Sequence, residues 1–90
     1  MQTHYLKTWP EFYKEILSGN KTFEIRKNDR KFETGDTLVL QEWDPLLVDR
    51  DNPSSGYTGN DIRRRVDYVL TSDKSDGLIA GYCVMTISLM

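Results

Sequence analysis

Residues 8–26 read TWPEFYKEILSGNKTFEIR, and the spacing of the apolar side chains changes within this stretch. The first half places them at helical spacing, at Phe12, Tyr13, Ile16 and Leu17. Thr8 or Trp9 can cap the start of such a helix, and Thr8 with Glu11 has the spacing of a capping box. Gly19 suits its end. The pattern predicts a helix so short that it must dock on another element to be stable.

After the glycine, the apolar period becomes two. Residues 22–26 alternate, which predicts a strand with Phe23 and Ile25 facing inward and Glu24 and Arg26 on the other face. Further strands are expected at residues 4–7, from 38 to about 42, 62–70 and within 77–90. One early helix followed by several antiparallel strands predicts an α+β, mainly β fold, a small curled or closed sheet with the helix plugging one end.

The chain of 90 residues is expected to form a single domain over residues 1–90. No run approaches the ~20 apolar residues that span a bilayer, so we expect no membrane partner. The lone Cys83 lies in an apolar run, which favours a buried, inert thiol in a reducing, cytoplasmic compartment. One His and one Cys provide no metal-ligand set, and no glycine-rich phosphate loop is present, so no cofactor is expected.

The net charge of −2 hides an uneven distribution. Residues 21–31 carry +3 and the run Arg63-Arg64-Arg65 carries another +3, so the remainder carries −8. If the two basic segments meet in space, they form a surface that attracts anions. If they do not, they are two solvated faces beside acidic neighbours. The long segment 44–60, rich in Pro, Ser and Gly, is expected to be a binding loop or a lid.

Lys21, Glu24 and Arg26 bring a lysine, a carboxylate and a guanidinium close together on one short segment. Such a cluster can bind a phosphate, hydrogen-bond a base edge or shuttle a proton. The same spacing also fits a solvated ion-pair face on a strand. The residues alone leave both interpretations open.

The string Gly19-x-Lys21-x-x-Glu24-x-Arg26 resembles the signature of ASCH domains, which are relatives of the PUA domains. The likeness extends over nearly the whole chain, from His4-x-Leu-Lys7 to Tyr57-Thr-Gly59, and is greatest to a small bacterial and phage branch of unknown function. The resemblance implies a PUA-like β-barrel of about five to six strands. The signature residues would line a cleft beside the helix and bind RNA or a nucleotide-like ligand, and we expect a monomer.

In this interpretation Lys21 and Arg26 contact phosphates, and Glu24 orients Arg26 or accepts from a base. The remaining basic and polar residues would extend the electrostatic track, namely Lys27, Asn28, Arg30, Arg63, Arg64 and Arg65. Trp43 and Tyr57 flank the long loop and offer either stacking faces for bases or ordinary packing.

Arg64 shares the apolar phase of its strand, with Ile62 and Val66. Alternation does not favour an arginine there without a bulge, an edge position or a paired role. It either points into the same cleft as Glu24 or lies on an edge strand with its stem along apolar surface.

The resemblance also implies an enzyme alternative, because some compact ASCH proteins are amidohydrolases that act on acylated nucleosides such as N4-acetylcytidine. Lys21 and Glu24 would then be catalytic. The family chemistry uses a threonine where this chain has Glu24, and a later glutamate in place of which the chain has Asp67, Asp73 and Asp76. A lysine paired with a carboxylate is a poor nucleophile or base, which weakens this alternative.

Two further alternatives remain. Other ASCH members are ribonucleases, and here His4 and Lys21 could supply the acid and the base. A phage protein-interaction module would use the acidic residues in and near the long loop, namely Asp44, Asp49, Asp51 and Asp61.

Overall fold

The protein, described over residues 1–90 by a computed structural model, contains five strands and one α-helix. In chain order these are β1 (Thr3–Thr8), α1 (Pro10–Leu17), β2 (Phe23–Lys27), β3 (Thr37–Trp43), β4 (Tyr57–Thr71) and β5 (Tyr82–Ser88). Two short 3₁₀-helices, η1 (Pro45–Leu47) and η2 (Ser72–Lys74), lie in the connections. The α+β, mainly β prediction is confirmed. No helix has the length and apolar character needed to cross a membrane.

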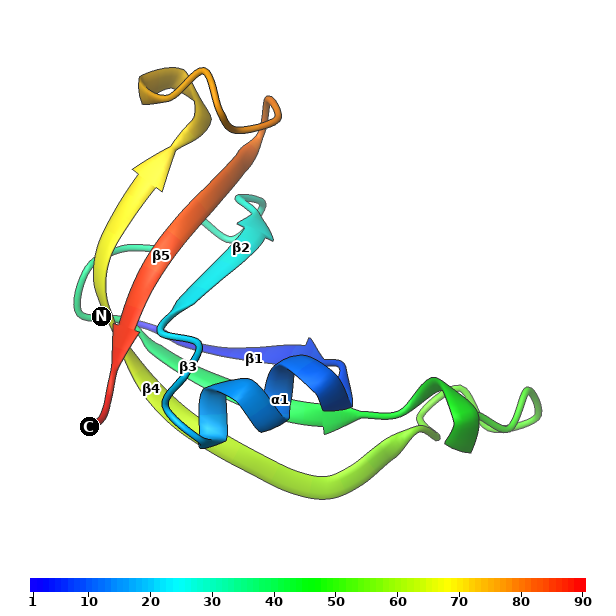
Figure 1. Ribbon diagram of the computed structural model, residues 1–90. Helices are drawn as coiled ribbons and strands as arrows, with labels where there is room; N and C mark the ends of the chain where they lie inside the picture. Colours follow the sequence, from blue (N-terminus) through cyan, green and yellow to red (C-terminus); the bar gives the residue numbers. More distant parts are fainter.

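All five strands belong to one sheet with the order β1-β3-β4-β5-β2. β1 runs parallel to β3, and the other pairs are antiparallel. The 15-residue β4 bends strongly, pairing with β3 along its first part and with β5 along its second (Figure 1). Its register with β5 shifts between Val66 and Tyr68. A bulge at such a point increases bending and twist. The sheet therefore curls into a half-barrel whose two edge strands are β1 and β2 (Figure 1).

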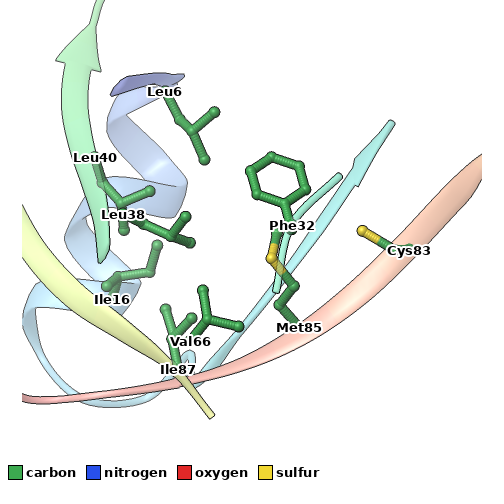
Figure 2. Close-up of a cluster of buried hydrophobic side chains, with 9 residues drawn as sticks. All are labelled: Leu6, Ile16, Phe32, Leu38, Leu40, Val66, Cys83, Met85 and Ile87. Carbon is green, nitrogen blue, oxygen red and sulfur yellow. The ribbon is translucent and has the colours of Figure 1, made fainter. Parts of the chain in front are cut away.

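The core lies on the concave side of this half-barrel, between the sheet and α1 (Figure 2). It is formed by nine side chains, Leu6, Ile16, Phe32, Leu38, Leu40, Val66, Cys83, Met85 and Ile87. Cys83 is fully buried as expected, and burial raises the pKa of its thiol. Only half of the predicted helical stripe is buried: Tyr13 and Ile16 are, whereas Phe12 and Leu17 remain exposed.

The predicted capping box is wrong. Trp9 is the N-cap of α1, and no side chain caps the helix. Thr8 is the last residue of β1, in register with Glu42, and its hydroxyl donates to the carbonyl oxygen of Leu6 over 3.3 Å. The extension of β1 through this residue takes its side chain away from the first turn of the helix.

Two boundaries also differ from the prediction. β4 begins at Tyr57 because this residue pairs with Trp43, so the connecting loop covers residues 44–56 rather than 44–60. β5 begins only at Tyr82, and Ile79 before it is exposed. In each case the cross-strand partner, which a local pattern does not specify, decides where the strand starts.

The prediction that Phe23 and Ile25 of β2 face the core is wrong. Phe23 and Ile25 are 42% and 53% exposed, whereas Glu24 is only 3% exposed. Glu24 lies opposite Met85 of β5 and shares the concave side with the core. A carboxylate tolerates this position only because its charge is paired.

Candidate functional site

The two edge strands of the half-barrel are joined by arginine side chains. Arg26 of β2 donates from Nη1 to the carbonyl oxygen of Lys7 over 2.9 Å and from Nη2 to Thr8 Oγ1 over 3.3 Å. Arg30, beyond the end of β2, donates to the carbonyl oxygen of Tyr5 over 2.8 Å. Carbonyls two residues apart point to the same side of a strand. The two guanidinium groups therefore donate hydrogen bonds to carbonyl oxygens on the open edge of β1. In a closed barrel, the backbone of a neighbouring strand would make these bonds.

The line along which the two edge strands β1 and β2 face each other is here called the seam. Glu24 is the centre of a charged cluster at this seam. Lys21 Nζ lies 2.7 Å from Oε1 and Arg26 Nε lies 2.8 Å from Oε2. Lys21 Nζ also donates to the carbonyl oxygen of Phe23 over 2.7 Å. The side chains of Lys21, Glu24 and Arg26 are 17%, 4% and 24% exposed, so the cluster is not a solvated surface ion pair. The three residues singled out in the sequence do come together.

The cluster forms part of the wall of a cavity of about 520 Å³, hereafter the seam cavity. Its lining consists of Lys7, Thr8, Trp9, Phe12, Lys21, Phe23, Glu24, Ile25 and Arg26. The Lys21 ammonium lies 4.9 Å from the ring centre of Phe23 and 5.6 Å from that of Phe12. Apolar walls with a few convergent polar groups, in a cavity of this size, are typical of a ligand-binding site.

A rigid aromatic rim adjoins the seam cavity. The Lys7 ammonium lies 4.2 Å from the ring centre of Trp43, and the Trp9 ring lies 5.8 Å from the same residue. The Trp43 indole donates to the carbonyl oxygen of Ser55 over 3.2 Å. Gly56 packs so closely under this indole that an added Cβ would lie 2.4 Å from Nε1. Trp43 is therefore fixed by packing and supports the rim from outside the lining.

Sequence reasoning did not single out Lys7, Trp9 or Phe12 as site residues. Lys7 is the penultimate residue of an edge strand, and the other two belong to the exposed side of a short amphipathic helix start. The sequence carried no signal for their exposure, because Trp9 is the N-cap of α1 and Phe12 fits the apolar spacing of its buried stripe.

Several predicted site residues lie outside the seam cavity. Lys27 is exposed at the end of β2. Asn28 forms a turn, because its side chain accepts from the Phe32 backbone over 3.2 Å and its own N–H donates to Gly81 over 2.8 Å. Tyr57 lines a separate small hollow on the β3–β4 hairpin.

None of the three consecutive arginines lines the seam cavity. Arg63 and Arg65 are exposed, and Arg64 is half-buried opposite Leu38. The edge-strand interpretation of Arg64 is wrong, because β4 lies between β3 and β5. Burial raises the pKa of Tyr13 and the nearby Glu42 and Asp61 add to it, whereas Arg64 acts in the opposite direction, which places Arg64 near the helix.

Lys21 and Glu24 line the seam cavity, but the other groups named for the enzyme alternatives lie elsewhere. Asp67, Asp73 and Asp76 do not line the seam cavity. Hydrogen bonds from Ser88 and Arg65 lower the pKa of Asp67, and one from Thr71 lowers the pKa of Asp73. His4 is buried elsewhere with its Nε2 2.9 Å from Asp36. The chain contains no group of three or more side chains positioned to hold a metal ion.

The comparisons with known proteins identify a family. The profile of a domain of unknown function, DUF3850, matches residues 3–87. The chain belongs to the DUF3850 family. An uncharacterised 12.9 kDa protein in the GpA 3′ region of Escherichia phage P2 is 35% identical to it over 75 residues, which cover 83% of this DUF3850 chain. The chain spans only 59% of the length of that phage protein.

Proposed function

We propose that this DUF3850 protein binds single-stranded RNA, or another single-stranded nucleic acid, in the seam cavity. The observation that carries the proposal is the paired cluster of Lys21, Glu24 and Arg26 in the wall of an aromatic-lined cavity. The same cluster supports kinship with the ASCH domains of the PUA-like superfamily, because it is formed by the residues of the ASCH-like signature. We further propose that the protein acts as a cytoplasmic monomer.

The size and walls of the seam cavity suit an unpaired base. Trp9, Phe12 and Phe23 contribute rings to the lining. Bases of single strands stack on aromatic side chains, and each such contact contributes about 1–3 kcal/mol. A duplex keeps its bases stacked on each other, so a cavity of this kind selects unpaired nucleotides.

The charged cluster retains hydrogen-bonding capacity toward a ligand. Lys21 uses two of its three ammonium protons, for Glu24 and the Phe23 carbonyl. Arg26 uses three of its five N–H groups, for Glu24, Lys7 and Thr8. Each Glu24 oxygen accepts one hydrogen bond and can accept another. The wall therefore offers both donors and acceptors, as recognition of a base edge requires.

The net charge of the cluster is only +1, because Glu24 neutralises one of its two cations. Phosphate contacts then fall mainly to the cations around it. Lys7 lies at the rim, and Lys27 and Arg30 lie at and beyond the end of β2. In this arrangement the cluster positions the base, and the rim attracts the backbone.

The seam cavity supports binding better than amidohydrolysis. The Lys21 ammonium already donates to two oxygens. Glu24 is the only acid in the lining and is held by two cations. A hydrolytic site needs a base or nucleophile that is available to the substrate.

The decisive test measures binding of a fluorescently labelled single-stranded RNA by anisotropy at several salt concentrations. We expect the double variant Lys21→Ala/Arg26→Ala to bind at least about tenfold more weakly, a loss of ~1.4 kcal/mol. The double variant Lys14→Ala/Arg50→Ala is the matched control, since it removes two exposed cations outside the seam cavity and should retain most of the affinity.

Circular dichroism must first show that both variants are folded, and Lys21→Gln provides a milder change if they are not. Equal affinities for the cavity variant and the control would refute the proposal. Turnover of N4-acetylcytidine that is lost in Lys21→Ala would favour the amidohydrolase alternative instead.

A further inference from the structure

The convex side of β1, β3 and β4 is a solvent-facing surface opposite the core. Residues that lie directly opposite each other on neighbouring strands point to the same face. Tyr5, Val39 and Arg63 form one such row, and Thr3, Thr37 and Arg65 form the next. Leu6 and Leu38, one position along their strands, belong to the core on the other side.

The two ends of this row, Tyr5 and Arg63, are exposed to solvent. Tyr5 is 54% exposed, and the Arg63 guanidinium has no hydrogen bond or ion pair within the protein. Between them, Val39 is only 1% exposed although it lies outside the core cluster. Tyr5 and Arg63 are its direct cross-strand neighbours on this face. The row is thus a close-packed platform with an aromatic ring at one end and an unpaired cation at the other.

The platform begins where the seam cavity ends. Lys7 lines that cavity and lies two residues after Tyr5 on the same face of β1. Arg30 lies at the same edge, since its guanidinium donates to the Tyr5 carbonyl. Two strand spacings, about 10 Å, separate Tyr5 from Arg63. A nucleic-acid strand that leaves the seam cavity over β1 would reach the Tyr5 ring first and Arg63 and Arg65 of β4 next.

We propose that Tyr5, Arg30, Arg63 and Arg65, here called the outer basic face, bind the continuation of the strand whose base occupies the seam cavity. This inference rests on the proposed function. Tyr5 stacks on one base, and the guanidinium groups contact phosphates. Arg65 already bonds to Asp67 over 3.1 Å and Ser88 over 3.2 Å, so Arg63 contributes the larger share.

The charge of this surface favours an anionic partner over a protein. Its three arginines and the adjoining Lys7 outnumber Asp61 and Asp67, on a protein whose net charge is −2. The convex side of the other half of the sheet differs, because beyond the seam cavity, which Phe23 and Ile25 line, it exposes the aromatic side chains of Tyr68 and Tyr82. The anionic chain is therefore assigned to the β1-β3-β4 half.

Oligonucleotide length separates this surface from the seam cavity. A labelled RNA of about twelve nucleotides, within the site sizes of single-strand-binding surfaces, can reach both. A dinucleotide can occupy the seam cavity alone. We expect Arg63→Gln/Arg65→Gln to bind the longer RNA about tenfold more weakly and to lower the salt slope by about 0.7 for each phosphate that the variant no longer neutralises. Its affinity for the dinucleotide should be unchanged.

The stacking role of Tyr5 is tested by comparison with a second exposed tyrosine, Tyr68. Tyr5 and Tyr68 are 54% and 58% exposed on the two halves of the convex side. Tyr5→Ala should weaken binding of the longer RNA, and Tyr68→Ala should not. Tyr5→Phe keeps the stacking face and should restore the affinity.

Unchanged affinity of the arginine variant for the longer RNA overturns this inference. The proposed function stays intact in that case if Lys21→Ala/Arg26→Ala weakens binding of the dinucleotide by at least about tenfold. A loss that is equal for both lengths also overturns the inference, since the variant then acts through the seam cavity. If the unmodified protein binds neither RNA, both proposals fail. Self-association that depends on these arginines would overturn the inference by identifying the face as a protein interface.

Discussion

Two buried carboxylates in this protein, Asp36 and Glu24, are both held by hydrogen bonds, but the groups that hold them differ. Asp36 accepts hydrogen bonds from the backbone N–H groups of Gln2 and Glu33 and from His4 Nε2, over 2.9, 3.0 and 2.9 Å. Glu24 is instead held by the partly exposed side chains of Lys21 and Arg26. Asp36 thereby ties the start of β1 to the turn before β3 in a buried site.

The difference lies in what the partners can do when the carboxylate is removed. Backbone N–H groups and the buried His4 cannot turn toward water, so they remain unsatisfied. Lys21 and Arg26 are partly exposed and can reorient into the seam cavity. A carboxylate held by backbone is thus expected to stabilise the fold, whereas one held by partly exposed side chains leaves donors that, in the proposed function, serve the ligand.

The largest expected effect is that of Asp36→Ala on stability. Because it leaves several buried donors unpaired, we expect the free energy of unfolding to fall by about 3–5 kcal/mol. Urea denaturation followed by circular dichroism measures it. Asp76→Ala removes an exposed carboxylate and is the control. Equal losses in the two variants would show that the Asp36 network contributes nothing special.

A smaller effect is expected for Glu24→Gln, which keeps the shape of the side chain. The free energy of unfolding should fall by about 1–2 kcal/mol, because both cations can reach water. The same variant raises the charge of the cluster from +1 to +2. RNA affinity should become more salt-dependent as a result. A stability loss as large as that of Asp36→Ala would remove the distinction between the two sites.

The smallest expected effect is a change in the acid limb of the stability profile. Burial by itself raises the pKa of Asp36, but hydrogen bonds from Gln2, His4 and Glu33 outweigh it and hold the pKa below the usual 3.8. The stability from this group is therefore complete above the unfolded-state pKa and is lost as the pH falls through the lower folded-state value.

Urea midpoints measured from neutral pH to acid should show this loss in the unmodified protein. Asp36→Asn is less stable near neutral pH and should show a flatter acid limb, because it lacks the titrating group. Parallel acid limbs for the two proteins would contradict the role assigned to Asp36.

Much of the secondary structure could be predicted because local spacing carries it. The change from helical to alternating spacing around Gly19 located α1 and β2, and the eight-residue signature located the charged cluster. The facing of β2 could not be predicted, since alternation shows that two faces differ but not which one is buried. Apolar Phe23 and Ile25 were expected inside, and the ion pairs of Glu24 reversed that order.

The sequence by itself determined the α+β, mainly β class and brought Lys21, Glu24 and Arg26 within six residues of each other, because both depend on local spacing. Only the tertiary structure decided that β1 and β2 are the two edges of one curled sheet. That arrangement lets Arg26 and Arg30 reach the carbonyls of β1, and so creates the seam cavity. It also placed Arg63 and Arg65 on the convex side rather than in that cavity. Strand order and curvature arise from pairing between distant segments, which no local pattern specifies.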